Sequence, residues 1–331
     1  AGFISICVTK RIPIDIVNVC YAFYRLEIAS FFSESMKARS LKFDDTQSNI
    51  DTYNMCACVQ DLHCNKEYFI ASNILSLLLD EEPDDAYLHF ALGLVYYDWK
   101  HLDEAEKQLS IAVQIQPETQ RYRYNYGVVL RKQQKYASSI QQLLRAVELD
   151  PYDAMSGKQL AICYKDYALF LCRNGKDLDQ AKEYFETAIK ISPNNCNLYY
   201  QYAIALTTHF DDYERSQVCY LKTLQFDSFK YGANGSYGFL LYLMGKYDES
   251  EKYIEIEMTA HPDNMSAFYF HSLLQHELGR PELAKQSLLT AVKLAASRTT
   301  LMLQRVQAYK RIDAKNIEYH CEFEKLLTMF H

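Results

Sequence analysis

The sequence predicts an all-α fold, a solenoid of antiparallel helix pairs, and three observations lead to it. Positions recur at a spacing of 34 residues, as Gly93 and Gly127 do, and as Pro117 and Pro151 do. Repeats of this length are typical of helical arrays. Within each repeat, apolar residues fall at steps of three and four in two blocks, which is helical periodicity. Most second blocks end at a proline, which cannot continue a helix. About seven such units are expected over residues 48–296.

The unit at residues 86–117 shows how each pair is built. Asp85 is suited to cap the first helix with its side chain. Gly93 and Ala105 are small, so the two helices can approach closely where these residues meet. Leu109 is expected to fill the space between them. The next unit has the same arrangement with Gly127, Ser139 and Leu143.

This pattern resembles the tetratricopeptide repeat (TPR) family. The Leu-Gly-x-x-Tyr stretch of that family's first helix appears here as Leu92–Tyr96, and its Ala-x-x-x-Phe stretch as Ala181–Phe185. The family's first-helix Trp is absent, and His89 holds that place in this unit. The resemblance covers about residues 50–296. It implies a right-handed superhelix of TPR pairs, a fold whose members bind other proteins.

Both ends of the chain are expected to add helices outside the array. Residues 1–47 are interpreted as N-terminal helices, either a degenerate repeat or a cap. Residues 297–331 are interpreted as capping helices, because an uncovered last repeat exposes its core face.

One repeat is longer than the others. Pro151 and Pro193 lie 42 residues apart, eight more than the 34-residue spacing. Eight residues make about one added turn on each of two helices, so the hairpin at 164–181 is expected to project. Gly175 is suited to a left-handed cap at its tip. Residues 169–171 would then be partly exposed as a docking point; packing of the insert on the next repeat is the alternative.

Composition argues against two classes of partner. The net charge is −7 with a pI near 5.8, and no dense Lys/Arg patch appears, so nucleic acid is not expected. No stretch reaches the roughly 18 apolar residues of a membrane span, so no membrane insertion is expected. The ten cysteines form no disulfide framework, which favours a reducing, cytoplasmic setting. Family usage adds cilium or cytoskeleton as a narrower hypothesis.

Motifs of catalysis and cofactor binding are absent from the sequence. There is no Gly-rich phosphate loop, no Gly-x-Ser-x-Gly elbow and no His-Glu-x-x-His helix. We therefore expect no enzyme activity, no catalytic residue, no cofactor and no metal. Cys56, Cys58, His63 and Cys64 lie close in sequence, but Cys-x-Cys on a helix points its thiols about 200° apart. Ordinary packing is favoured over a zinc site.

The family resemblance places partner binding in a concave groove lined by successive first helices. Carried onto this sequence, the groove residues that the resemblance implies are Tyr87, Phe90, Arg121, Tyr124, Asn125, Lys158, Tyr200 and Tyr269, with Phe239, Tyr242 and Phe270 on the same face. Of the clamp that some members use for chaperone C-termini, only Asn125 is present, so a chaperone-tail receptor is not favoured.

The function expected from the sequence is a non-enzymatic scaffold that holds the parts of a larger protein assembly. Two alternatives stay open. One is a receptor for a linear peptide motif in the concave groove. The other is the regulatory TPR region of a larger enzyme.

Overall fold

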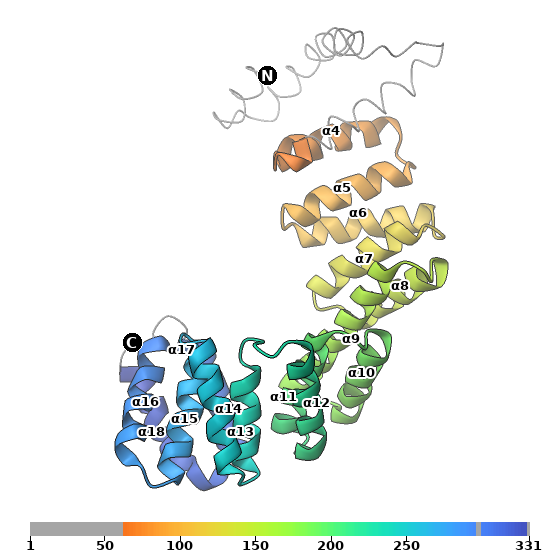
Figure 1. Cartoon of the computed structure of the whole chain (residues 1–331). Helices are drawn as coiled ribbons and strands as arrows, with labels where there is room; N and C mark the ends of the chain where they lie inside the picture. Colours follow the sequence, from red (N-terminus) through yellow and green to blue (C-terminus); the bar gives the residue numbers. More distant parts are fainter. Residues whose placement is uncertain (1–61, 296–298, 330–331) are drawn as a thin grey trace, which may run out of the picture. The chain divides into compact units, whose positions relative to one another are not determined.

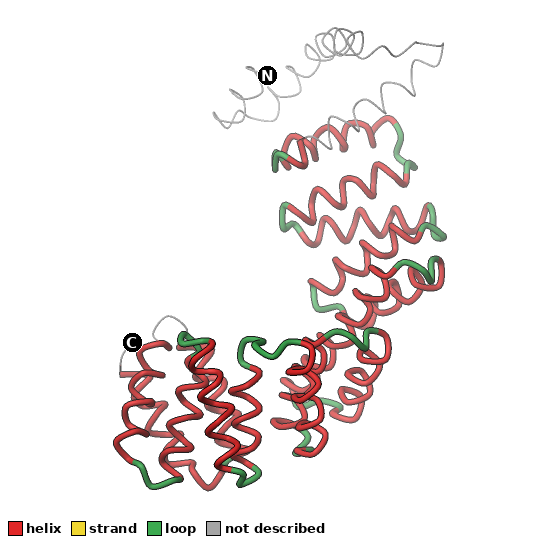
Figure 2. Tube along the Cα trace, viewed as in Figure 1, coloured by secondary structure: helices red, strands yellow, loops and turns green. Residues whose placement is uncertain are grey.

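A computed structural model describes residues 62–295 and 299–329, and all regular secondary structure in these ranges is helical (Figures 1 and 2). The chain divides into two units, residues 1–61 and 62–331. Only the second unit is described below. The helices expected within residues 1–47, and the start of the array expected from residue 48, lie outside the described residues.

After α4 (Tyr68–Glu81), the helices of the described unit form successive antiparallel pairs (Figure 1). The pairs are α5 (Ala86–Asp98) with α6 (Leu102–Ile115), α7 (Gln120–Lys132) with α8 (Tyr136–Leu149), α9 (Ala154–Asn174) with α10 (Leu178–Ile191), α11 (Cys196–His209) with α12 (Tyr213–Phe226), α13 (Ala233–Leu243) with α14 (Tyr247–Ala260), and α15 (Met265–Glu277) with α16 (Pro281–Ala295). Two further helices, α17 (Thr299–Ile312) and α18 (Ile317–Met329), follow and are joined by a short 3-10 turn, η1 (Ala314–Asn316). The expected all-helical solenoid is confirmed.

Helix caps and turns repeat with the sequence. The side chain of Asp85 accepts hydrogen bonds from the backbone N–H groups of Tyr87 and Leu88, as an N-cap residue does. Asp153 caps α9 in the same way. Most repeats have one residue with a positive φ in or near the turn that precedes the second helix. These residues are Lys66, Lys100, Gln134, Asp211, Gly245 and Gly279. Successive members of that set lie 34 residues apart, except across the longer third pair.

Close approach inside each pair depends on small residues, as the sequence predicts. A Cβ added at Gly93 would lie 2.6 Å from Leu109 Cγ. A Cβ added at Gly127 would likewise lie 2.6 Å from Leu143 Cγ. In that second pair, Ser139 is buried, and its hydroxyl donates a hydrogen bond of 2.7 Å to the carbonyl oxygen of Gly127.

The longer third pair differs from its expectation. α9 has 21 residues whereas α7 has 13, and α10 has 14, as α8 has. The prediction of one added turn on each helix is therefore wrong, because the first helix takes all the extra length. Ala168, Leu171 and Cys172 explain this, since they are buried against residues of α11 and carry the apolar periodicity onward. Packing of the insert on the next pair, the stated alternative, is what the structure shows. Gly175 ends α9 with φ of 61°, as predicted.

Candidate functional site

The first helices α5, α7 and α9 carry exposed side chains at equivalent positions. Tyr87 on α5, which is 39% exposed, Arg121 on α7 and Met155 on α9 lie 34 residues apart and are all exposed. Lys158, one turn farther along α9, is exposed as well. Between them runs an aliphatic row of half-buried side chains, one from each helix and 34 residues apart: Leu94, Val128 and Ile162. These seven residues are called the open face below.

Two further residues that the sequence places in the groove, Tyr124 and Asn125, lie on α7 and already have partners within the chain. Tyr124 is half-buried, and burial raises the pKa of its hydroxyl, while a hydrogen bond with Gln159 acts in the opposite direction. Asn125 uses its side-chain amide to donate a hydrogen bond of 2.8 Å to the backbone carbonyl of Arg121. That amide would have to leave its own helix before it could bond to a peptide.

The electrostatics of this region are basic. Asp166 is shared by two cations, Arg131 at 2.7 Å and Lys165 at 3.0 Å. Within the described part of the chain, no ion pair involves Arg121 or Lys158. The guanidinium of Arg121 lies over the ring of Phe90, 5.1 Å from its centroid. A partner with carboxylates would therefore meet cations that are not already neutralised.

Phe90 itself does not line the open face. Its side chain is only 1% exposed and stacks on Tyr122, with ring centroids 4.7 Å apart. The prediction that Phe90 lines the groove is therefore wrong, and the reason is its packing within the repeat. The ring packs between α5 and α7, and the guanidinium of Arg121 lies over it.

The equivalent surface of α11, α13 and α15 is covered by the chain's own C-terminal helices. The ring of Tyr309 on α17 lies 5.2 Å from that of Phe239 on α13 and 5.3 Å from that of Phe270 on α15. Arg305, also on α17, donates a hydrogen bond of 2.6 Å to the hydroxyl of Ser266. In Figure 1, α17 and α18 lie behind α13–α16, alongside these pairs. Met302, Val306 and Tyr309 form the buried stripe of α17.

A chain of buried polar groups fixes these helices. Tyr269 bonds through its hydroxyl to Nδ1 of His320, and Nε2 of His320 lies 3.3 Å from Oδ2 of Asp313. The hydroxyl of Tyr242 donates to the same oxygen at 3.1 Å. Burial acts to raise the pKa of Asp313, but hydrogen bonds from His320, Asn316 and Tyr242 prevail and lower it. The carboxylate therefore stays charged and joins α13 and α15 to the C-terminal helices.

Tyr269 is accordingly wrong as a groove residue, because its side chain is 0% exposed beneath α17 and α18. Phe239, Tyr242 and Phe270 are buried for the same reason. Tyr200 on α11 is half-buried, and its hydroxyl pairs with that of Ser236 at 3.4 Å. The sequence does indicate that α17 covers these residues. Met302, Val306 and Tyr309 are apolar and lie at helical spacing, so one face of α17 can be buried.

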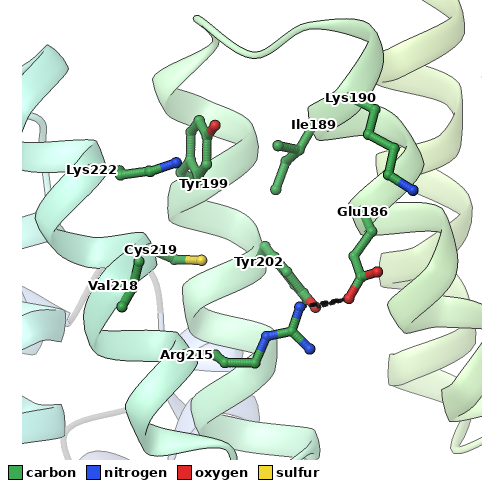
Figure 3. Close-up of a pocket in the computed structure, with 9 residues that line it drawn as sticks. All are labelled: Glu186, Ile189, Lys190, Tyr199, Tyr202, Arg215, Val218, Cys219 and Lys222. Atoms are coloured by element: carbon green, nitrogen blue, oxygen red, sulfur yellow. Dashed lines mark hydrogen bonds and ion pairs between the residues drawn. The ribbon is translucent and has the colours of Figure 1, made fainter.

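A second concave feature lies between the second helices α10 and α12, above α11. This hollow has a volume of about 360 Å³ (Figure 3). Its lining residues are Glu186, Ile189, Lys190, Tyr199, Tyr202, Arg215, Val218, Cys219 and Lys222. It includes none of the residues proposed from the sequence.

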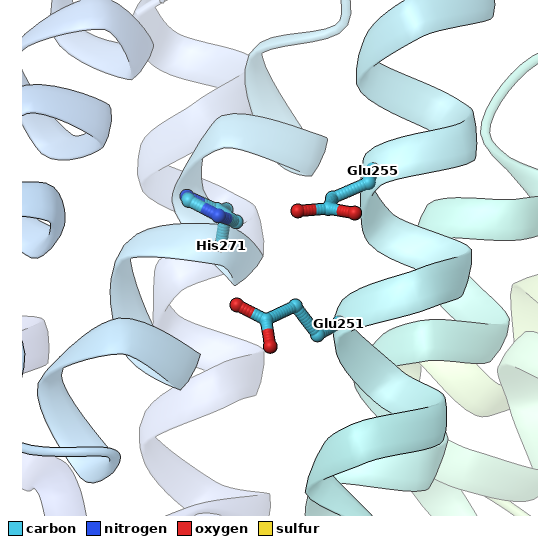
Figure 4. A group of neighbouring side chains, drawn as sticks. All are labelled: Glu251, Glu255 and His271. Carbon is cyan, nitrogen blue, oxygen red and sulfur yellow. The ribbon is translucent and has the colours of Figure 1, made fainter.

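Three potential metal ligands also come together. Glu251 and Glu255 on α14 point toward His271 on α15, with one ligand atom of each within 4.8 Å of the others (Figure 4). Protein donors already occupy this cluster. Gln275 donates at 2.7 Å to Glu251 and lies 3.1 Å from His271 Nε2, and Arg280 donates at 2.8 Å to Glu251. The cluster is a hydrogen-bonded link between α14 and α15.

No helix in residues 62–295 or 299–329 combines the length and the apolar character that a membrane crossing requires.

Comparison with known proteins identifies the repeats. Tetratricopeptide repeat models match residues 90–154, 170–195 and 266–298. The chain is similar to the C-terminal part of a TPR repeat-containing protein from Cytophaga hutchinsonii, with 15% identity, 72% of this chain and 94% of that chain covered, and a TM-score of 0.57. It is also similar to a tetratricopeptide repeat protein from Parabacteroides merdae, with 12% identity, coverage of 83% and 98%, and a TM-score of 0.50. At these identities the likeness concerns the fold alone. The chain therefore contains tetratricopeptide repeats, at the residues that these models match.

Proposed function

We propose that this chain is a non-enzymatic scaffold for a larger protein assembly, and that its main partner binds the open face. TPR repeats are in general modules of protein–protein interaction. The proposal places a protein segment, extended or helical, across α5, α7 and α9.

One observation supports this choice of surface. The open face presents an aliphatic row beside two unpaired cations, Arg121 and Lys158, whereas the same row on α13 and α15 is buried under α17. A surface of this kind suits apolar side chains accompanied by carboxylates, because opposite charges across an interface favour encounter and fix register. Arg is among the residue types that most often dominate binding energy.

A linear-peptide receptor, the alternative, would use the same face, but its contact surface would be smaller than that of a scaffold. A receptor would make contacts only on the open face. A scaffold would also use other surfaces, such as the exposed loop at residues 173–177 at the end of α9. That loop is polar, so contact there would be through Arg173 or Lys176. A ciliary or cytoskeletal setting rests on family usage and stays a prediction.

The test is a paired charge reversal on the full chain. Arg121→Glu with Lys158→Glu should lower recovery of the main partner at least tenfold in quantitative affinity purification, because a residue that dominates binding contributes about 2 kcal/mol or more. The matched control is Lys107→Glu with Lys285→Glu, which makes the same charge change on the second helices α6 and α16.

Unchanged recovery with a normal circular-dichroism spectrum would refute the open face as the site. Crosslinking mass spectrometry on the recovered complex separates scaffold from receptor. Crosslinks from several surfaces support a scaffold, and crosslinks confined to α5, α7 and α9 support a receptor.

A further inference from the structure

Among the joints that connect the successive pairs from α5 to α16, the joint between α10 and α11 brings the two helices together over the shortest stretch. The preceding helix, α9, instead extends over α11 with its added residues, among them Ala168 and Leu171. At this joint α10 and α12 leave the hollow of about 360 Å³ between them (Figure 3). Its volume falls within the roughly 300–1,000 Å³ typical of ligand pockets.

The floor and one wall of the hollow are apolar. Tyr199 and Tyr202 of α11 are buried at its base, and Cys219 of α12 lies beside them. Val218 of α12 stands at the wall and is 56% exposed, and Ile189 of α10 points toward the two tyrosines (Figure 3). An apolar side chain placed here would remove from water the surface that faces the floor and this wall, at about 25 cal/mol per Å² buried.

One end of the hollow is closed by an ion pair. Arg215 of α12 donates to Glu186 of α10 at 2.7 Å, and the hydroxyl of Tyr202 donates to the same oxygen at 3.2 Å (Figure 3). Burial acts to raise the pKa of Glu186, but the hydrogen bonds from Arg215 and Tyr202 prevail and lower it. The carboxylate therefore stays charged, and the charge of Arg215 is largely neutralised.

The remainder of the rim is positive and aromatic. The amine of Lys222 lies 5.0 Å from the ring centroid of Tyr199, and Phe226 stacks on the same ring at 6.0 Å. Lys190 stands on the opposite side of the hollow (Figure 3). Among the described residues, neither Lys190 nor Lys222 takes part in an ion pair. A ligand entering here meets an apolar floor with the ammonium group of Lys222 at one rim, and Lys190 stands on the opposite helix with its amine turned outward (Figure 3).

We propose that this hollow is a second docking site, which takes one large apolar side chain, flanked by carboxylates, from a segment of a partner protein. The apolar side chain fills the space over Tyr199 and Tyr202. Its neighbouring carboxylates pair with Lys190 and Lys222. This charge complementarity selects the partner segment, because a basic or neutral segment would leave the two lysines without a counter-charge. The site is separate from the open face and independent of it.

The test uses short fluorescent peptides and the full chain. One peptide carries a central Phe or Leu between glutamates, and a matched peptide carries lysines in place of the glutamates. Fluorescence anisotropy should show at least tenfold tighter binding of the glutamate peptide. Lys222→Glu should weaken that binding about tenfold, and Val218→Asp, which puts a charge in the wall, should abolish it.

Two control variants on α16 match these changes. Lys285→Glu reverses an exposed lysine, and Leu283→Asp replaces a side chain that is 46% exposed. Neither should change binding, and circular dichroism should show that all four variants are folded. The reversal of Arg121 and Lys158 on the open face should also leave binding intact, so failure of the proposed function and failure of this site are distinguishable.

Three results would overturn the assignment. They are absence of binding by the glutamate peptide up to millimolar concentration, equal binding of the two peptides, and equal binding by Lys222→Glu and the unchanged chain. Sedimentation equilibrium tests a second copy as the occupant. Self-association that Val218→Asp removes would show that the hollow contacts another copy of this chain and not a partner segment.

Discussion

Small residues at the crossing points decide how closely the helices of a pair approach. At Gly238 an added Cβ would lie 2.6 Å from Ile254 Cγ1 and 3.1 and 3.2 Å from backbone atoms of Ser250 and Ile254. Gly157, inside α9, has its nearest such atom at 4.0 Å. The two glycines therefore differ in their tolerance of a methyl group, although both are helical.

Alanine at these two positions should change stability in opposite directions. Gly238→Ala forces the helices of one pair apart and should lower the free energy of unfolding by about 1–3 kcal/mol. Gly157→Ala should raise it by up to about 1 kcal/mol, because alanine favours the helix and meets open space. Urea unfolding followed by circular dichroism measures both. A stabilising Gly238→Ala would contradict the close crossing of α13 and α14.

Cysteine reactivity gives a second test at the residue scale. Burial raises the pKa of Cys163, Cys172 and Cys219 to about 11 each, so these groups are protonated thiols at pH 8. The thiolate is the reactive form, and Cys64 is exposed. Iodoacetamide at pH 8 should therefore modify Cys64 while the three buried cysteines stay unmodified until the chain is unfolded, as peptide mass spectrometry would show. Rapid modification of Cys172 would mean that the end of α9 does not pack on α11.

At the scale of the elements, what could be predicted was local. The pairing, the helix caps and the close contact of Gly127 with Leu143 follow from spacing within one repeat, and each is confirmed. The repeat spacing does not predict the length of α9, because the burial of Leu171 depends on α11 in the next pair. Tyr269 was misplaced for a similar reason, since the residues that cover it lie beyond the repeats. Sequence periodicity identifies which face of a helix is apolar but does not say what covers it.

The C-terminal helices should behave as one docked element. Tyr309→Ala removes the ring that packs on Phe239 and Phe270, a change that costs about 3–5 kcal/mol for a buried aromatic residue. Because α17 and α18 pack on α11, α13, α15 and α16 and not on α5 or α7, the loss should appear locally. Hydrogen exchange should accelerate across α17 and α18 and remain unchanged across α5 and α7.

The matched control for that experiment is Tyr152→Ala, because Tyr152 is 96% exposed. It should leave exchange unchanged throughout. Equal acceleration in α5 and in α17 would contradict local docking, since it would show that the array unfolds as one unit.

At the scale of the whole chain, the surface formed by the first helices has two parts. One part is exposed and basic, and the other is buried under α17. The chain carries a net charge of −7, yet Arg121 and Lys158 leave the open face basic. Farther along the chain, Tyr309 and its neighbours on α17 already fill the corresponding surface of α13 and α15. A partner can thus reach the first helices of the described unit at α5, α7 and α9 without displacing α17.

Hydrogen exchange on the full chain, with and without the partner recovered through Arg121 and Lys158, tests this division most directly. We expect α5, α7 and α9 to gain protection on binding. We expect α13 and α15 to be protected already and to stay unchanged. Gain of protection in α13 and α15 together with loss in α17 would contradict the account, because the partner would then be taking the place of the C-terminal helices.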